Sequence, residues 1–287
     1  VERRIDEEAA LPFDLERGPL VRAALLQCDE AEHVLLLTLH HIVADGWSMG
    51  ILVREIGALY EAHRRGAPAS LPPLPIQYTD YASWQRAWMR HDVLQRQLAF
   101  WTEHLASAPA ALDLPLDHPR PLVQSPAGGV ASFAIDAELT EGLRALGLRC
   151  SATLFMTLMA AFAALLSRYS RQTDVVVGMP IANRNRQEVE GLIGLFANIL
   201  PLRIDLAGDP STEQLIEQVR GAALAAYAHQ DLPFEQLVAA LNPARDLAHT
   251  PVFQVLFVLQ NTPLARLALP GLELSTIPRK AAAARFD

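Results

Sequence analysis

The stretch His40–Ser48, with the sequence HHIVADGWS, decides how the rest of this chain is interpreted. The apolar run Val34–His40 that leads into it predicts a β-strand, and its lack of polar alternation indicates burial on both faces. A turn follows at Ala44–Gly46, after which Ser48 can cap a helix. Adjacent residues of a strand point to opposite faces, so only one of the two histidines can face a given cavity.

The residue types in this stretch suit acyl transfer. Imidazole is the side chain whose ordinary pKa lies near neutral pH, which fits it for proton transfer. Asp45 could orient a histidine or hold the loop by pairing with an arginine, and Gly46 would supply backbone freedom and close approach. Short patterns such as His-x-x-x-Asp also occur in cores, where histidines merely lie beside a turn carboxylate. The full string favours the catalytic interpretation over that structural one.

Composition indicates a globular, acidic chain. The 287 residues carry a net charge of −8 and are 51% hydrophobic, enough for one large core or two medium ones. The acidic balance, without a Lys/Arg cluster, argues against a nucleic-acid partner. Cys28 and Cys150 lack metal-ligand spacing and fit a reducing compartment. The most apolar run, Ala152–Leu166, is too short to span a bilayer and predicts a buried core helix, so we expect a soluble, cytoplasmic protein.

A proline-rich stretch separates two halves with similar patterns. Residues 108–129 show almost no periodicity and are the best candidate for a boundary. Strands and helices on both sides predict an α/β fold, an α+β sandwich of two lobes at 1–122 and 123–287. The expected strands are Leu20–Gln27, Val34–His40, Val130–Ile135, Asp174–Ile181, Leu200–Leu206 and Val252–Gln260, and the expected helices are Ser48–Arg65, Tyr78–Leu105, Glu138–Arg149, Ser151–Tyr169, Ser211–His229 and Pro233–Leu241. The first two strands should pair antiparallel, Gly66 should lie just past the end of the first helix, and Ser211 should cap the helix that it begins.

The string HHIVADGWS resembles the His-His-x-x-x-Asp-Gly-x-Ser signature of condensation domains from nonribosomal peptide synthetases. Further strings resemble other motifs of that family and follow in the family's order. They are Tyr78–Trp84 (YTDYASW), Ile193–Arg203 (IGLFANILPLR), His229–Glu235 (HQDLPFE), and Arg245-Asp246 with Pro251–Phe257 (PVFQVLF). Together they extend over nearly the whole chain, which makes the resemblance specific. One departure is Ile199, where the family usually has Thr, and we attach no functional meaning to it.

The resemblance implies two lobes similar to chloramphenicol acetyltransferase, arranged as a V-shaped pseudo-dimer with a tunnel between them. His41 and Gly46 match the family's catalytic positions. Structural positions around the active site are matched by His40, Asp45, Trp47 and Ser48. In the family Asp45 would pair with an arginine from an early motif that lies outside this chain. Asn198 matches a possible tunnel-lining position.

The function implied is amide bond formation, in which the α-amine of an acceptor aminoacyl group attacks an upstream aminoacyl or peptidyl thioester. Both substrates would arrive on 4′-phosphopantetheine arms of donor and acceptor peptidyl carrier domains, with an adenylation domain adjoining in the parent synthetase. No metal and no intrinsically bound cofactor is expected. The run Gly178–Arg186 resembles domains that join L-configured residues, rather than domains that take a D-configured donor.

Other members of the superfamily are alternatives. An epimerisation domain shares His-His-x-x-x-Asp, but the continuation Gly46–Ser48 and the string His229–Glu235 argue against it. A cyclisation domain would carry a carboxylate pair in place of the histidines, and plant-type acyltransferases carry a late Asp-Phe-Gly-Trp-Gly that this sequence lacks. A non-catalytic docking module of the same fold would usually have lost the second histidine, which is present here as His41.

The ends of the chain suggest a piece of a longer domain. It opens at Val1 rather than Met, and the family's two earliest motifs and its closing portion are absent. Both lobes would then be incomplete. We expect these 287 residues alone to be poorly soluble and inactive in condensation, because strands without neighbours expose backbone edges and apolar faces.

Overall fold

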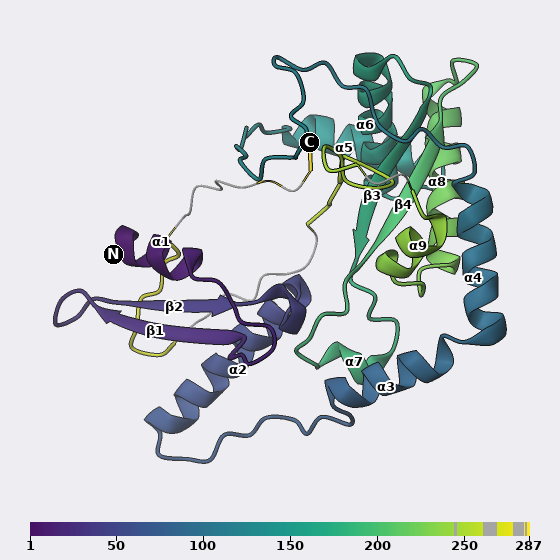
Figure 1. Cartoon of the computed structure of the whole chain (residues 1–287). Helices are drawn as coiled ribbons and strands as arrows, with labels where there is room; N and C mark the ends of the chain where they lie inside the picture. The colour runs from purple at the N-terminus through teal and green to yellow at the C-terminus, as the bar shows by residue number, and fades with distance from the viewer. Residues whose placement is uncertain (244–245, 261–268, 278–283, 285) are drawn as a thin grey trace. The chain divides into compact units, whose positions relative to one another are not determined.

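The computed structural model describes residues 1–243, 246–260, 269–277, 284 and 286–287, and it shows a mixed α/β chain (Figure 1). The chain divides into two compact units. Unit 1 contains the described residues of Val1–Ser83, Arg184–Ala197 and Thr262–Ser275, and unit 2 contains those of Trp84–Asn183, Asn198–Asn261 and Thr276–Asp287. The chain therefore passes between the units several times. The assignment of lobes to 1–122 and 123–287 in the complete fold stays a prediction.

Unit 1 holds a two-stranded antiparallel sheet with its helices. Its elements are α1 (Glu2–Ala10), β1 (Val21–Gln27), β2 (His33–Leu39), the 3₁₀ helix η1 (His41–Val43), α2 (Gly46–Arg64), the first part of α3 (Tyr78–Trp88) and α7 (Gln187–Glu190). The strands pair from Val21 with Leu39 to Gln27 with His33, which confirms the expected pairing. Gly66 follows α2 in the left-handed conformation, with a φ of 65°, as expected for a residue just past a helix end.

Strand β2 is covered on one face rather than two. Its residues alternate between exposed and half-buried, and 49% of Leu35 and 37% of Leu37 are exposed. The prediction that this run is buried on both faces is therefore wrong. Alternate residues of a strand share a face. A run of apolar residues is therefore compatible with a strand buried on one face or on both faces. The sequence of this run could not distinguish the two cases.

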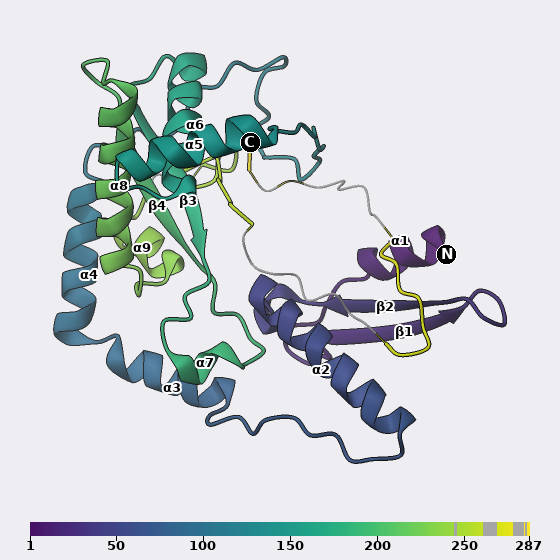
Figure 2. The ribbon, with the colours of Figure 1, turned by 180° about the vertical axis from the view of Figure 1, so that it is seen from behind.

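The main apolar core lies in unit 2, around a second antiparallel sheet (Figure 2). Its elements are the rest of α3, α4 (His91–His104), α5 (Ala137–Arg149), α6 (Leu154–Ser170), β3 (Asp174–Ile181), β4 (Asn198–Asp205), α8 (Thr212–Ala228) and α9 (Phe234–Leu241). The strands pair from Asp174 with Asp205 to Ile181 with Asn198. Helix α6 packs on β3, α8 packs on β4, and the two helices pack on each other. The most enclosed side chains of this core are Met159, Ala163, Val175, Val177, Leu202, Val219, Ala223 and Ala226.

Side-chain caps set the starts of α5, α6 and α8 in unit 2. The side chain of Ser211 accepts the amide of Gln214, and the side chain of Gln214 accepts the amide of Ser211, so a capping box starts α8. This confirms the cap predicted at Ser211. Helix α6 is capped by Thr153 and begins a few residues later than the sequence pattern suggested.

Three expected elements differ in the structure. The helical stretch predicted for residues 78–105 divides into α3 and α4, because Arg90 is extended and His91 has a φ of 46°. Val130–Ile135 forms no strand with any described residue, and Phe133 is 88% exposed. The run Val252–Gln260 makes a single parallel bridge, to Gly178, instead of a strand. An apolar pattern indicates that a segment can form a β-strand, but it does not show whether a neighbouring strand is present to pair with it.

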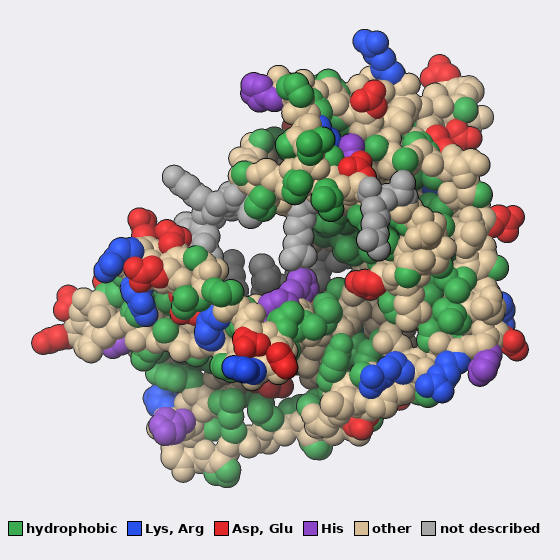
Figure 3. All heavy atoms as spheres, in the orientation of Figure 1, with side chains coloured by type: hydrophobic (Ala, Val, Ile, Leu, Met, Phe, Trp, Pro, Cys, Tyr) green, Lys and Arg blue, Asp and Glu red, His purple; other side chains and the backbone are tan. Residues whose placement is uncertain are grey.

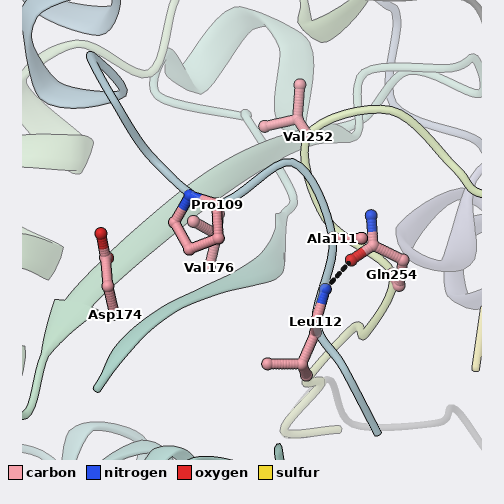
Figure 4. A pocket seen from close by; sticks show the side chains of 7 residues that line it. All are labelled: Pro109, Ala111, Leu112, Asp174, Val176, Val252 and Gln254. Atoms are coloured by element: carbon pink, nitrogen blue, oxygen red, sulfur yellow. Dashed lines mark hydrogen bonds between the residues drawn. The ribbon is translucent and has the colours of Figure 1, made fainter. Parts of the chain in front are cut away.

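The segment at this bridge is fixed by two main-chain hydrogen bonds to Gly178 and by its side chains. The ring of Phe253 lies where a Cβ on Gly178 would be, so β3 requires glycine at that position. The Oε1 atom of Gln254 accepts the amide of Leu112 at 2.8 Å (Figure 4). The cavity drawn beside this bond has a volume of about 10 Å³, which leaves room for a single water at most. Phe253 and Gln254 therefore anchor this segment to β3 and to Leu112, and the cavity beside them is too small for a ligand.

The surface carries charges of both signs, interspersed over the face drawn in Figure 3. In the part of the chain that the structure describes, no single helix is long and apolar enough to cross a membrane. Helices α5 and α6 reach the length and composition of a membrane span only when they are taken together, and this pair is bent by 101°. The apolar run Ala152–Leu166 falls largely in α6, whose inner face is buried in the unit 2 core.

Candidate active site

The candidate site is the turn between β2 and α2, which carries His41. This residue begins η1 and is exposed. Its Nδ1 atom lies 2.8 Å from the carbonyl oxygen of Ala44. A carbonyl only accepts hydrogen bonds, so Nδ1 carries the proton and Nε2 of the neutral ring keeps its lone pair. The turn therefore presents one imidazole nitrogen as a proton acceptor in a fixed tautomer.

Asp45 begins α2 at the end of the same turn. Its Oδ1 atom accepts the amide of Ser48 at 2.8 Å, which makes Asp45 the N-cap of the helix in place of the predicted Ser48. Its Oδ2 atom accepts the amide of Phe196 at 3.0 Å. Burial alone would raise the pKa of Asp45. The hydrogen bonds from Ser48 and Phe196, together with the charge of Arg184, outweigh it and hold this pKa below its ordinary value.

Arg184 is the ion-pair partner of Asp45. Its Nη2 atom lies 3.1 Å from Oδ1 and 3.3 Å from Oδ2, and the two side chains are almost completely buried. Nη1 donates to the carbonyls of Val189 and Leu192, and the guanidinium lies 4.0 Å above the ring of Phe196. Burial lowers the pKa of Arg184, an effect that the Asp45 charge opposes. The expectation that the arginine partner lies outside this chain is therefore wrong.

The sequence contained Arg184 but suggested a different role for it. It lies in the run Gly178–Arg186, which indicated the configuration of the joined residues. Its carboxylate partner is 139 positions earlier in the chain, and no periodicity connects them. The sequence did contain one signal of this role. Arg184 follows closely after the buried strand β3, and an arginine that is buried there needs a partner for its charge.

Ser48 links the turn to the segment Ile193–Phe196. Its Oγ atom lies 2.7 Å from Asp45 Oδ1, 2.9 Å from the Gly194 carbonyl and 3.1 Å from the Gly194 amide nitrogen. It also accepts a hydrogen bond from Arg184 at 3.0 Å. Ser48 has no measurable exposure, which agrees with the structural position that the sequence suggested. The hydroxyl thus ties the first turn of α2 to a main-chain segment far along the chain.

The string Tyr78–Trp84 joins the same cluster through its tyrosines. The ring of Tyr78 covers Gly194 so closely that a Cβ there would overlap it, and its hydroxyl donates to the Leu195 carbonyl at 2.7 Å. Tyr81 packs against Phe196 with ring centres 4.7 Å apart. Three strings that are remote in sequence therefore meet within unit 1, and their contacts explain why glycine and aromatic residues occupy these positions.

Trp47 and Gly46 occupy the first turn of α2. The indole of Trp47 donates to the Glu190 carbonyl at 3.0 Å and is 36% exposed. Gly46 has no left-handed backbone angle, and a Cβ built on it would meet nothing within 4 Å. The expected need for backbone freedom at Gly46 is therefore wrong, and no described protein atom requires glycine there.

His40 has different partners from His41. It directly follows β2, and its ring meets Phe13 edge to face with centres 5.6 Å apart. Its own amide donates to the Leu20 carbonyl at 3.0 Å. The two rings thus make separate contacts, although both residues lie in a turn rather than in the strand.

Asn198 belongs to unit 2, where it holds a loop. Its amide nitrogen donates to the carbonyls of Gln230 and Leu232 at 2.9 and 2.8 Å, and its oxygen accepts the amide of Phe234 at 3.0 Å. The residue is 8% exposed. These bonds attach the string His229–Glu235 to the start of β4. A tunnel-lining role for Asn198 stays a prediction.

The motif arginine of β4 also has a structural partner. Arg203 pairs with Asp174, with Nη2 and Oδ2 2.7 Å apart, and donates to the carbonyls of His104 and Ala106 at the end of α4. The motif residue Arg245 lies outside the described residues. Among the residues that the structure describes, no group of three or more His, Cys, Asp or Glu side chains is arranged to hold a metal ion.

Comparison with known families identifies this arrangement. The family model for the condensation domain matches residues 1–287. The chain belongs to the condensation domain family. Among curated relatives, malpinin synthetase from Mortierella alpina is 52% identical over 99% of this chain, and malpibaldin synthetase from the same organism is 50% identical over 98%. The chain spans only 4% and 5% of the lengths of these two synthetases, so it matches one small part of each.

Solved structures share the fold. The X-domain from teicoplanin biosynthesis is 33% identical, with a TM-score of 0.89 over 98% of this chain and 64% of that one. The first condensation domain of the calcium-dependent antibiotic synthetase, in complex with substrate analogue 2a, is 27% identical, with a TM-score of 0.67 over 85% of this chain and 55% of that one. The expected α/β fold of the chloramphenicol acetyltransferase kind is thereby confirmed.

Proposed function

We propose that this condensation domain forms an amide bond between an acceptor aminoacyl group and an upstream aminoacyl or peptidyl thioester, with His41 as its catalytic residue. The observation that carries the proposal is the hydrogen bond from His41 Nδ1 to the Ala44 carbonyl, which leaves Nε2 as a proton acceptor. Gly46 is the second catalytic candidate, because a Cβ at that position would meet no protein atom and substrate can approach it.

In this reaction the acceptor nitrogen attacks the thioester carbonyl, a C–N bond forms, the C–S bond breaks and the sulfur leaves as a thiol. One proton of the amine passes to His41 Nε2 and from there to the leaving sulfur. An α-amino group has a pKa of about 7.7–8.0, so roughly a tenth of it is neutral near pH 7 and no strong base is needed. Orientation of the two substrates can supply about 7–11 kcal/mol, and a positioned histidine adds about 10²–10⁴-fold. We therefore assign the larger share of the rate to positioning.

Asp45, Arg184 and Ser48 act in this proposal by fixing the turn. Their hydrogen bonds anchor the start of α2, directly after the residue that binds His41. Trp47 contributes through its bond to the Glu190 carbonyl. A small displacement of a catalytic group can cost about 10²-fold in rate, so a rigid anchor has a kinetic value as well as a structural one.

The proposal includes the partners and the setting. The substrates would arrive on 4′-phosphopantetheine arms of donor and acceptor carrier domains, and an adenylation domain would adjoin in the parent cytoplasmic synthetase. The synthetase relatives and a four-domain nonribosomal synthetase of 28% identity support these partners. We also propose that both joined residues are L-configured, on the resemblance of the run Gly178–Arg186.

The test compares the parent domain, carrying its natural flanks, with its His41→Ala variant in an assay with two aminoacyl carrier proteins. We expect the variant to lose dipeptidyl product by about 10²-fold or more while its melting temperature stays the same. His33→Ala, an exposed histidine of β2 in the same unit, is the matched control and should retain full yield. Equal yield from His41→Ala would remove His41 from the mechanism. A wild-type domain that binds both carriers without forming product would instead indicate a docking module.

A further inference from the structure

The first histidine of the pair has a hydrogen bond that ring packing does not explain. Strand β2 ends at Leu39, and the 3₁₀ helix η1 begins at His41. Between them His40 is extended, with φ −71° and ψ 137°, and its Nδ1 atom accepts the amide of Ile42 at 3.1 Å. His40 is thus the N-cap of the turn that carries His41, a role usually filled by Ser, Thr, Asp or Asn.

This bond fixes the tautomer of His40. An amide N–H only donates, so Nδ1 of His40 must offer its lone pair, and the proton of the neutral ring lies on Nε2. His41 has the reverse arrangement, because its Nδ1 donates to the Ala44 carbonyl. The two adjacent imidazoles are therefore held in opposite tautomers. Only the neutral form of His40 can act as the cap, since a doubly protonated ring would direct a second N–H at the Ile42 amide.

The orientation of the His40 ring is set from the segment before β1. Phe13 meets this ring edge to face, and the Arg22 guanidinium lies 4.0 Å above the ring of Phe13. Arg22 in turn pairs with Glu8 and donates to the carbonyls of Glu8 and Leu11. Among the charged groups on the elements packed here, Arg22 and Glu8 neutralise each other. Asp45 is neutralised by Arg184.

We propose that His40 is a positioning residue, which holds His41 in its working geometry by capping η1 through a neutral ring. The inference rests on the proposed function, in which His41 is the reacting histidine. Loss of the cap frees the Ile42 amide and loosens the turn, so His41 Nε2 is no longer aimed at one place. Removal of the Nδ1 acceptor should therefore lower turnover.

Two substitutions separate the cap from the packing. His40→Asn places an oxygen where Nδ1 lies, so it keeps an acceptor for the Ile42 amide but removes the ring. His40→Phe keeps a ring against Phe13 but has no acceptor. Each variant is measured in the full-length parent protein with both carrier domains, for kcat, for the KM of each carrier and for melting temperature.

We expect His40→Phe to keep its melting temperature within a few degrees and its KM values unchanged, while kcat falls about tenfold. His40→Asn should recover kcat to within about threefold of wild type. His40→Asn alone decides the outcome if His40→Phe does not fold.

Wild-type kcat in His40→Phe, or a kcat in His40→Asn no higher than that of His40→Phe, would overturn the inference. His41→Ala is assayed beside them. If His41→Ala is inactive while His40→Phe behaves as wild type, the positioning role fails and the proposed function stands. If His41→Ala is active, the proposed function itself fails.

Discussion

Unit 1 is organised by buried polar groups, whereas unit 2 is organised by an apolar core. In unit 1 the buried positions next to the candidate site include three polar side chains, Asp45, Ser48 and Arg184, which bind one another and nearby main-chain groups. In unit 2 the corresponding positions are apolar side chains from β3, β4, α6 and α8. Hydrogen bonds are directional, so a polar network specifies one geometry, but it tolerates the loss of a member poorly. Apolar packing tolerates changes that conserve volume. The turn that carries His41 thus lies in the unit where geometry is held more strictly.

The strongest test of this contrast removes one partner of the buried ion pair. Arg184→Met leaves Asp45 buried without its counter-charge, so we expect the free energy of unfolding to fall by about 3–5 kcal/mol in urea titrations. Arg203→Met is the matched control in unit 2, where the pair with Asp174 is a quarter exposed and screened by solvent. Its ion pair should be worth about 1 kcal/mol or less.

The double variant Asp45→Leu, Arg184→Met sharpens the same test. Removal of both charges should restore much of the stability that the single variant loses, because no unpaired charge remains buried. Equal losses in Arg184→Met and Arg203→Met would show that the two units do not differ in this respect.

A smaller effect is expected from adding a methyl group to a glycine in each unit. Gly194→Ala would push a Cβ into the ring of Tyr78, so unit 1 should lose up to about 3 kcal/mol. Gly142→Ala lies in the middle of α5 with open space around its Cβ, and it should stabilise unit 2 by up to about 1 kcal/mol through helix propensity. Chemical denaturation of both variants measures whether each substitution lowers or raises the free energy of unfolding. A neutral Gly194→Ala would contradict the close contact with Tyr78.

Asn198 provides an exception inside unit 2, since it is a polar residue that holds a loop. Asn198→Ala removes three hydrogen bonds and should cost about 1–2 kcal/mol, because the amide of Phe234 loses its acceptor. Asn198→Asp retains that acceptor, but its second carboxylate oxygen would face the carbonyls of Gln230 and Leu232 at a buried position, so it should be at least as unstable as the alanine variant. Hydrogen exchange at the Phe234 amide measures the loop directly. Unchanged exchange in Asn198→Ala would mean that the loop is held by other contacts.

The smallest expected effect is a difference in acid sensitivity. Burial lowers the pKa of His104 in unit 2, with the Arg203 charge adding to it, so the folded state binds fewer protons than the unfolded state. His104 therefore makes its full contribution to the free energy of unfolding above about pH 6.5, the ordinary histidine pKa. This contribution is lost as the pH falls toward the lowered pKa of the folded state. Asp45 in unit 1 also has a lowered pKa, so its contribution is lost only below its ordinary value of about 3.9.

Melting temperature against pH distinguishes these two windows. Between about pH 6.5 and 5, His104→Gln should flatten the loss seen in wild type, and Asp45→Asn should leave its slope unchanged. A wild-type stability that does not change over this range would show that the His104 ring remains free to take up a proton in the folded state.

The sequence predicted most of what is local and little of what is remote. The strand pair β1–β2, the hairpin strands β3 and β4, the cap at Ser211 and the position of Gly66 all follow from patterns within a few residues. The role of Arg184 could not be predicted in this way, because its partner is far away in sequence and only the fold brings them together. The strand at Val130–Ile135 failed for the same reason, since no described residue pairs with it.

For the candidate site, the resemblance supplied the residue positions and the structure supplied the contacts that could explain them. His41, Asp45 and Ser48 were recognisable from one short string, but the tautomer of His41 depends on a carbonyl, which no side-chain pattern records. The capping role of His40 was equally hidden, because histidine is rarely found at an N-cap.

The segment Arg184–Ala197 has a property that concerns protein engineering. It contributes Arg184, Gly194 and Phe196 to unit 1, yet it connects β3 to β4, whose last and first residues, Ile181 and Asn198, are paired. The pairing of β3 with β4 therefore holds the two ends of this segment together, whatever its internal sequence is. The entropic cost of closing the loop is met by that strand pairing. Such a segment can be exchanged between related domains as one cassette, without a change of strand register, and every exchange would replace the ion-pair partner of Asp45 and the surface under Tyr78 in a single step.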